Sequence, residues 1–536
     1  MANSGPNSQV KVIVQYKHAP QMSAVSRVQK LGGRMSGGLS LVRSVAYTVP
    51  AGRLAELEND PDVAYVSLDH SLKAFDDYTD AAMNASSFAN AGYDGTGITV
   101  AVIDSGINDT HVDLGNGNNS RVLYHQDFTG TTTYLNHKQV WDLYGHGTHV
   151  AGIIGGNGKK SAGRYAGVAP NVNFVDLRVL DATGIGTDSA VIAAIQQAIS
   201  LKNTYNIKVI NLSLGRGISE GYAQDPLDQA VESAWKAGIV VVVAAGNFGR
   251  ISVYGSNGYG TVAAPGNDPL VLTVGAMKSM GTYSRGDDQI ASYSSKGPTT
   301  FDHVVKPDVV APGNLVVSTN SKGSVLEAEF PDNDVAGNAS NDYFLLSGTS
   351  MATPAVAGGV ALMLQKDSTL TPDQVKARLM KTAYKNFPTS STATDPATGQ
   401  TYTDYYDVFT VGAGYVDLAA ALANTDKAPA VVGSALSPTA TCNPRTGNVT
   451  LSNGNSMVAS SSVVWGTSVL WGSSVVWGTN VSGSSVVWGS SVVWGSSTAT
   501  GFSVVWGTST DSGASVVWGA SLLGANGAFN AAEAEE

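Results

Sequence analysis

Three short polar segments, far apart along the chain, carry the residue types that acyl transfer requires. They are Asp104-Ser105-Gly106, His146-Gly147-Thr148-His149 and Gly348-Thr349-Ser350. A serine is a poor nucleophile at neutral pH, so it needs a neutral imidazole to take its proton and a buried carboxylate to orient that imidazole. Taken singly, the aspartate could be a helix cap and the histidine a turn residue. The three segments together supply one candidate of each type and predict acyl transfer on a serine.

The serine segment leads into a run of small apolar residues, 355–361, that is typical of a buried helix. A hydroxyl at the start of such a helix lies among backbone N–H groups that have no intrahelical acceptor, at the positive end of the helix dipole. This setting is suited to holding an oxyanion.

The elements that position these residues alternate between apolar strands and helical patterns. We expect strands at 98–103, 173–180, 209–213 and 239–245, with helices at 189–202 and 226–237. Near-continuous apolar strands that alternate with helices predict an α/β fold with a parallel sheet covered on both faces. Ligands of such sheets bind beyond the carboxyl ends of the strands, where Asp104, Ser213 and Asn247 would share one rim.

The same motifs resemble the signatures of the subtilisin-like serine proteases, the subtilases of peptidase family S8. The resemblance covers about residues 81–424, and the order Asp, His, Ser is the one known for subtilisin. It implies a parallel-sheet, three-layer catalytic domain and an endopeptidase that needs no cofactor for its chemistry. It further implies that Ser350 is the nucleophile, His146 the general base and then acid, and Asp104 the orienting carboxylate. It also implies an oxyanion hole formed by the Asn247 side chain and the Ser350 N–H, and a structural role for His149.

The resemblance also implies where substrate binds. An extended peptide would add as a strand between two edge segments, and side-chain pockets would supply selectivity. The residues expected to contact substrate are Ser213, Leu214, Gly215, Gly184, Ile185, Gly186, Ala245, Gly246 and Ala263. Ala263 stands where a glycine often floors the main pocket, and Phe248 stands where some members carry an acid. We therefore expect a somewhat shallow apolar pocket that favours medium hydrophobic residues over lysine.

A structural calcium ion is an open question at this stage. Asp113 matches a position that helps to bind calcium in many subtilases. The loop at 155–166, however, differs from the usual ligand loop, and Lys159 and Lys160 would oppose a cation.

The first part of the chain reads as a small domain of its own. After a disordered start at 1–8, residues 9–76 show the order β-α-β-β-α-β of a ferredoxin-like arrangement. Subtilases are made with an inhibitory propeptide of this kind, the inhibitor I9 type. The resemblance therefore implies a zymogen whose own propeptide acts as intramolecular inhibitor and folding aid. We expect self-cleavage within 72–78, ahead of a catalytic domain at 77–425.

Residues 426–536 form a linker and a tail in which a unit of the type Ser-Ser-Val-Val-Trp-Gly recurs. The tryptophan spacings are close to multiples of six, which would keep every Trp on one face of a strand. A low-complexity tail without a packed core explains the composition equally well. An alternative function is therefore a catalytically silent surface or adhesion protein that acts through these repeats. A lipase or esterase is disfavoured, since Gly-X-Ser-X-Gly is absent around Ser350.

Composition bears on which partners the protein can bind and on where in or outside the cell it acts. Lys and Arg number 31 against 42 Asp and Glu, so the net charge of −11 gives no electrostatic footprint for nucleic acid. The longest apolar run is too short for a membrane span. The only cysteine, Cys442, excludes an intrachain disulfide. The start lacks the pattern of a secretory signal. We expect a secreted protein whose signal has been removed, acting on protein or peptide substrates.

Overall fold

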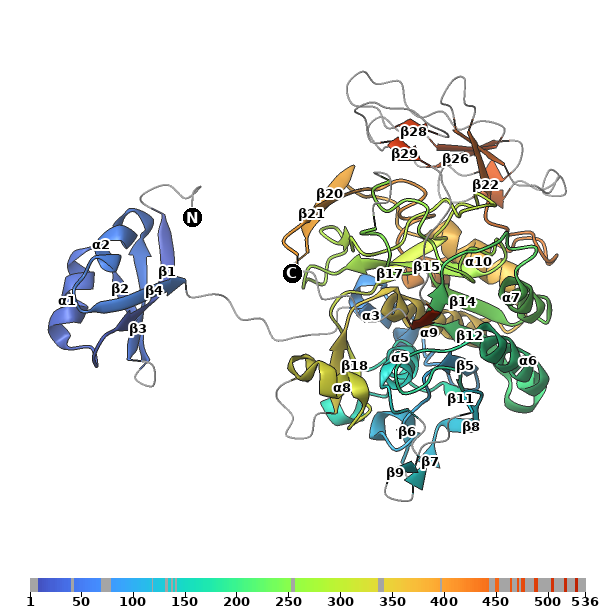
Figure 1. Cartoon of the computed structure of the whole chain (residues 1–536), viewed down its shortest axis with the longest axis horizontal. Coiled ribbons are helices and arrows are strands. Elements are labelled where there is room, and N and C mark those ends of the chain that lie inside the picture. The colour runs from blue at the N-terminus through green and yellow to red at the C-terminus, as the bar shows by residue number, and fades with distance from the viewer. Residues whose placement is uncertain are drawn as a thin grey trace. The chain divides into compact units, whose positions relative to one another are not determined.

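The computed structural model divides the chain into two compact units, Met1–Phe75 and Asp76–Glu536 (Figure 1). It describes residues 8–39, 43–68, 79–117, 119–130, 134–135, 138–139, 142–251, 256–335, 342–395, 398–442 and 449–452, together with seven short strands between 463 and 528. The expected cleavage region at 72–78 lies outside these residues, as do 1–7 at the start of the chain.

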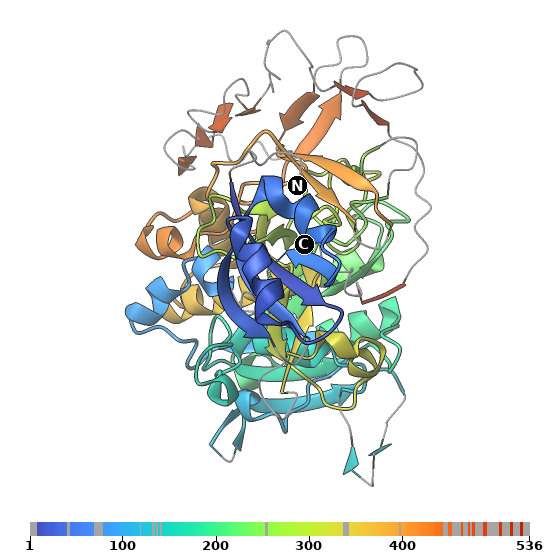
Figure 2. The ribbon, with the colours of Figure 1, turned by 90° about the vertical axis from the view of Figure 1, so that its left-hand side faces the viewer.

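The first unit has the element order that the sequence predicts. Its elements are β1 (Gln9–Tyr16), α1 (Met22–Lys30), β2 (Arg34–Leu39), β3 (Ser44–Pro50), α2 (Leu54–Glu58) and β4 (Val63–Leu68). The strands form one sheet in the order β2-β3-β1-β4, with antiparallel neighbours throughout. Both helices lie on the same face of this sheet (Figures 1 and 2). Alternate residues of β1 and β3, such as Val12, Val14, Tyr47 and Val49, point into the core under the helices.

The second unit is an α/β fold built on a largely parallel sheet, as predicted. The sheet order is β16-β15-β14-β12-β5-β11-β8, and β17 also pairs with β15. Its strands are β5 (Thr99–Asp104), β8 (Val122–Asp127), β11 (Asn173–Arg178), β12 (Ile207–Leu212), β14 (Val240–Ala244), β15 (Leu272–Lys278), β16 (Gln289–Ile290) and β17 (Val309–Pro312). Only β16 among them runs antiparallel to its neighbour. Every residue of β5, β14, β15 and β17 is buried, which explains why these segments are continuous apolar runs.

Helices cover both faces of this sheet. Two of them, α5 (His146–Gly155) and α9 (Thr349–Lys366), pack against each other on one face, while α6 (Asp188–Tyr205) and α7 (Pro226–Lys236) pack together on the other. The remaining helices are α3 (Thr79–Ala82), α4 (Ser86–Asn90), α8 (Val325–Glu329), α10 (Pro372–Thr382) and α11 (Leu418–Ala423). Local sequence sets the helix starts: Asp225 caps α7 ahead of Pro226, and Thr371 forms a capping box with Gln374 at α10.

Shorter strands form two-stranded sheets outside the main sheet. They are β6 (Gly115–Asn116), β7 (Asn119–Ser120), β9 (Tyr134–Leu135), β10 (Lys138–Gln139), β13 (Leu214–Arg216), β18 (Val316–Thr319), β19 (Tyr343–Leu346), β20 (Ser390–Thr394), β21 (Thr401–Tyr405), β22 (Thr439–Cys442) and β23 (Val449–Ser452). The tail adds β24 (Val463–Val464), β25 (Leu470–Trp471), β26 (Ser474–Trp477), β27 (Val486–Gly489), β28 (Ser503–Val505), β29 (Ser515–Val517) and β30 (Asn526–Ala528). Three of the seven tryptophans of the repeat fall in these strands.

Candidate active site

Asp104 and His146 form a buried hydrogen-bonded pair. Asp104 is the last residue of β5 and His146 is the first of α5, so a strand end and a helix start bring them together. The distance from His146 Nδ1 to Asp104 Oδ1 is 2.7 Å, and both side chains are at most 1% exposed. Burial alone would lower the pKa of His146, but the charge of Asp104 and its hydrogen bond raise it above the ordinary value.

The far side of each group in this pair is left without a partner. Within the described residues, His146 Nε2 and Asp104 Oδ2 are buried and accept or donate no hydrogen bond. Most buried polar atoms in proteins are satisfied, so an unpaired ring nitrogen in this position calls for an explanation. An imidazole held at Nδ1 and unpaired at Nε2 can take a proton from a hydroxyl placed beside it.

Asp142 locks the start of α5, and sequence reasoning missed it. Its carboxylate accepts hydrogen bonds from the backbone N–H groups of Gly145 and Thr148, at 2.7 and 2.8 Å, and from the hydroxyls of Thr148 and Ser105. The Ser105 Oγ in turn accepts from Gly147 N at 2.9 Å. A β-carbon at Gly147 would lie 2.2 Å from the carbonyl oxygen of Gly106, which explains the glycine. An acidic residue shortly before a glycine-initiated helix is the signal that could have identified Asp142.

Ser350 lies in the first turn of α9 and is tied to the residue that precedes β13. Its Oγ donates to the carbonyl oxygen of Ser213 at 3.1 Å, and Ser213 Oγ donates to the carbonyl oxygen of Ser350 at 2.9 Å. Pro354 explains the second bond: proline has no N–H, so the carbonyl four residues earlier lacks its helical donor. The Ser213 hydroxyl supplies the missing donor and fixes the turn that carries Ser350.

Asn247 is oriented toward the same turn. Its Oδ1 accepts from both N and Oγ1 of Thr349, each at 2.9 Å. With Oδ1 so engaged, the amide nitrogen faces the other way, and a β-carbon on Gly348 would lie 3.0 Å from it. The close approach and the φ of +155° at Gly348 together explain why a glycine precedes Thr349.

The residues expected to bind substrate gather around β13. Arg216 exchanges both backbone hydrogen bonds with Ala264, at 3.0 and 2.8 Å, and Ala263 N donates to the carbonyl of Ala245 at 3.0 Å. Beside them, Phe248 packs on Ala244 and Ala263. A β-carbon on Gly246 would touch both Ala263 and Phe248, at 3.3 Å each. The structure therefore places Ala245, Gly246 and Ala263 in one apolar cluster next to β13.

The other expected edge segment packs on an aromatic ring beside His146. Gly184 has a φ of +75° and lies against the Tyr144 ring, where a β-carbon would come within 2.6 Å. The ring centroids of Tyr144 and His146 are 6.4 Å apart. Ile185 is 55% exposed, and its backbone is held by Asp181 on both sides. Gly186 follows in the same loop, directly before the Thr187 cap of α6.

His149 and Asp113 have structural surroundings. His149 Nε2 lies 3.0 and 3.2 Å from the carbonyl oxygens of Phe344 and Val316, and burial lowers the pKa of His149 to about 3. The carboxylate of Asp113 is buried and accepts from the Lys160 N–H at 2.9 Å and from the Tyr343 hydroxyl. Each of its oxygens thus accepts a hydrogen bond from a protein donor, and a calcium ion at Asp113 stays a prediction. No group of three or more His, Cys, Asp or Glu in the described part of the chain could hold a metal ion.

Comparisons with known proteins decide the family. Residues 95–414 match the family model described as "Subtilase family". The chain belongs to the subtilases. It is therefore a subtilisin-like serine endopeptidase, an enzyme class that acts on proteins and needs no cofactor for catalysis. The silent adhesion protein that the repeats suggested is not favoured.

Two curated relatives of this subtilase are serine proteases of Bacillus subtilis (strain 168). Serine protease AprX is 37% identical over 342 residues, which cover 62% of this chain and 72% of the relative. Subtilisin E is 35% identical over 386 residues, which cover 70% and 86%. A crystal structure of a cold adapted subtilisin-like serine proteinase is 32% identical, covers 60% of this chain and 88% of its own, and gives a TM-score of 0.40. Within the described residues of this subtilase, no helix is both long and apolar enough to cross a membrane.

Proposed function

We propose that this subtilase cleaves peptide bonds through an acyl-enzyme on Ser350. The observation that carries the proposal is the buried 2.7 Å contact between His146 Nδ1 and Asp104, with Nε2 unpaired on a helix that packs against α9. In this mechanism His146 takes the proton of Ser350 Oγ as the hydroxyl attacks the carbonyl carbon, and then gives it to the leaving amine. Asp104 holds the Nδ1–H tautomer and stabilises the imidazolium.

Charge that develops on the substrate oxygen would be held by two N–H donors. One is the amide nitrogen of Asn247, which the contacts of Thr349 with Oδ1 turn away from Thr349. The other is the backbone N–H of Ser350 in the first turn of α9, where N–H groups have no intrahelical acceptor. Such preorganised donors stabilise the transition state without reorganising during the reaction.

Substrate selection would combine backbone pairing and one apolar pocket. An extended peptide would lie between β13, continued by Ser213, and the segment formed by Gly184, Ile185 and Gly186. The side chain before the cut would enter the cluster of Ala245, Gly246 and Ala263, which Phe248 closes from one side. A shallow apolar pocket of this kind, without a carboxylate, would prefer medium hydrophobic residues. Peptides varied at that position would test this, and strong preference for lysine would contradict it.

The enzyme would be made as a secreted zymogen. Residues 9–76 would act as the propeptide, since they form a compact unit with its own core. The secreted location is supported by the relatives, among which an extracellular serine proteinase of Thermus is 35% identical over 360 residues.

The deciding experiment follows the intact mass of the full chain over time, with casein as added substrate. Wild type should lose about 70–80 N-terminal residues and digest casein, while the Ser350→Ala chain should stay whole and inactive. Ser200→Ala, an exposed serine on α6, is the matched control and should behave as wild type. A Ser350→Ala chain that still digests casein would refute the assignment of the nucleophile.

A further inference from the structure

The last strand of the tail pairs with the substrate-binding edge of the α/β unit. Strand β30 runs antiparallel to β13, with Leu214 opposite Ala528, Gly215 opposite Gly527 and Arg216 opposite Asn526. Among the described residues of the tail, β24 pairs with β25, β26 with β27 and β28 with β29. In Figure 1, β30 is the dark red strand beside the label of α9, apart from β26, β28 and β29. This tail strand thus takes the place that the proposed function gives to a substrate.

The backbone groups that meet β30 can be identified from the opposite edge of β13. The backbone N–H and carbonyl of Arg216 are both hydrogen-bonded to Ala264. Backbone groups of successive residues in a strand point to alternate sides, so those of Gly215 face β30. Gly215 and Gly527 are therefore the hydrogen-bonded pair. Ser213, Leu214 and Gly215 are all buried in the full chain, as expected for an edge that already has a neighbour.

The pairing of β30 with β13 runs toward Ser213, which contacts the candidate nucleophile Ser350. In the sequence, Ser213 comes directly before Leu214, and Phe529 comes directly after Ala528. The carbonyl oxygen of Ser213 lies 3.1 Å from Ser350 Oγ. Phe529 and the residues after it lie outside the described part of the chain, and the sequence supplies their chemistry. The side chain at 529 is apolar, like the residues that line the proposed pocket. The seven residues that follow, Asn-Ala-Ala-Glu-Ala-Glu-Glu, are polar or small.

We propose that the C-terminal segment is an intramolecular substrate and that the enzyme cuts its own chain between Phe529 and Asn530. The proposal rests on the proposed function, because it uses the same nucleophile. Ser350 Oγ bonds to the carbonyl carbon of Phe529 while His146 takes its proton. The bond to the Asn530 nitrogen then breaks, and this nitrogen leaves as an amine with that proton. Water hydrolyses the ester, which regenerates Ser350 and leaves Phe529 with a free carboxylate.

The test starts from full-length chain purified in denaturant, refolded by dilution and followed by intact mass, with casein digestion measured in parallel. Wild type should lose residues 530–536 in a first-order reaction whose rate does not change with protein concentration. Gly527→Pro removes one ladder hydrogen bond to Gly215 and should slow this loss about tenfold. Ser521→Pro lies in the tail outside β30 and is the matched control. Phe529→Lys should abolish the cut at this bond and leave casein digestion unchanged.

The outcomes separate this inference from the proposed function. A wild-type chain that digests casein at full rate but keeps its mass through Glu536 overturns the inference alone. The same holds for a loss that becomes faster with protein concentration, or one that Gly527→Pro and Ser521→Pro affect equally. If neither casein nor the tail is cut, the proposed function fails and the inference fails with it.

Discussion

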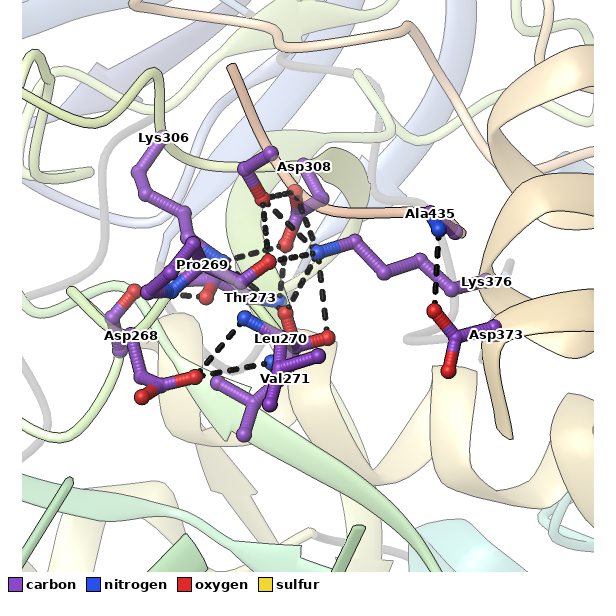
Figure 3. Close-up of polar contacts among 12 residues, drawn as sticks. Asp268, Pro269, Leu270, Val271, Thr273, Lys306, Asp308, Asp373, Lys376 and Ala435 are labelled. Carbon is purple, nitrogen blue, oxygen red and sulfur yellow. Dashed lines mark hydrogen bonds and ion pairs between the residues drawn. The ribbon is translucent and has the colours of Figure 1, made fainter. Parts of the chain in front are cut away.

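Two regions of the α/β unit bury carboxylates in opposite ways. Asp104 and Asp308 are each at most 1% exposed, and each contacts a basic side chain. Asp104 has one oxygen bonded to His146 and one without a partner in the described structure. Asp308 has both oxygens satisfied, in a cluster that lies between β15, β17 and α10 (Figure 3).

The lysine cluster, defined here as Lys306, Asp308 and Lys376, is saturated with partners. Lys306 Nζ donates to Asp308 and to the carbonyl of Val271, at 2.8 and 2.9 Å. Lys376 Nζ lies 3.1 Å from Asp308 and reaches further acceptors. These acceptors are the carbonyls of Pro269, Leu270 and Val271 and the Ser437 hydroxyl. Burial would raise the pKa of Asp308, but the charges of the two lysines lower it.

The contrast separates a site built for stability from one built for chemistry. A buried ion pair whose every atom is bonded has no group left to react, and removing one partner leaves an uncompensated charge. A pair with an unsatisfied nitrogen keeps a proton acceptor ready at some cost in stability. The same substitution, aspartate to asparagine, should therefore affect activity in one region and stability in the other.

Asp104→Asn should produce the largest effect, a loss of about 10⁴-fold in turnover, as seen for this change in other triad proteases. The amide can no longer hold His146 in the Nδ1–H tautomer. It also removes the charge that raises the pKa of His146. Activity needs the neutral imidazole, so wild-type activity should fall as pH drops through a value above about 6.5. The residual activity of the variant should fall only at lower pH.

The measurement is a pH profile of kcat/KM for both chains, with unfolding followed in a Ser350→Ala background to prevent autolysis. The free energy of unfolding should change by no more than about 1 kcal/mol. A profile whose midpoint does not move, or a chain that fails to fold, would contradict this account of Asp104.

Asp308→Asn should cost about 3–5 kcal/mol in the free energy of unfolding, since two buried ammonium groups lose their counter-charge. Asp308 has a lowered pKa in the folded state, so its contribution is present above the unfolded value of about 3.9. That contribution disappears as pH falls through the folded value. Denaturant unfolding of wild type and variant should therefore converge in acid.

Activity per folded molecule is the control for this variant. Asp308 lies outside the proposed site, so kcat/KM measured below the unfolding transition should match wild type. A variant that is stable but inactive would show that the lysine cluster is coupled to the active site.

Asn247→Ala should lower turnover about 10²–10³-fold, the loss known for the equivalent change in subtilisin, itself a subtilase. KM should change little, because the lost donor acts on charge that exists only in the transition state. Asn247→Asp sharpens the test: it keeps an acceptor for Thr349 but has no amide donor. If the aspartate variant retains wild-type kcat, Asn247 only positions the turn.

The proposed catalytic residues could be predicted from the sequence, because they lie at the ends of strands and the starts of helices, and both positions have recognisable sequence patterns. Asp104 ends an apolar run, and Asn247 comes shortly after β14. His146 directly follows Gly145 and Ser350 lies two residues after Gly348, and each of these glycines is the N-cap of a helix. Parallel strands bring such ends to one edge. The α/β fold followed from the same runs and was confirmed.

The contacts that hold the proposed catalytic residues in place, and those of the lysine cluster, could not be predicted in this way. The Ser213 hydroxyl serves a carbonyl that Pro354 leaves without a donor, across 137 residues of chain. Asp308 contacts Lys376 and Ser437 only when α10 packs against the sheet. No hydrophobic periodicity in the sequence indicates these contacts. Strand β30, with the sequence Asn-Gly-Ala, has little strand propensity, so only the partner β13 gives it that structure. The donors to Asp113, which are the Lys160 N–H and the Tyr343 hydroxyl, likewise come from distant segments that only the structure brings together.

A third buried carboxylate, Asp228, gives a prediction about the pH dependence of stability. Burial raises the pKa of Asp228 to about 9. Within the described residues its carboxylate accepts one hydrogen bond, from the amide of Asn267 at 2.8 Å. Between about pH 4 and pH 9 the folded state therefore holds a proton that the unfolded state has lost, so stability falls as pH rises. Asp228→Asn removes this dependence. At pH 8 it should raise the free energy of unfolding, and at pH 4 it should leave it unchanged. Urea unfolding at the two pH values checks both signs. A loss of stability at pH 8 would mean that Asp228 is charged and paired in the fold, like Asp308, and that burial alone does not distinguish the two.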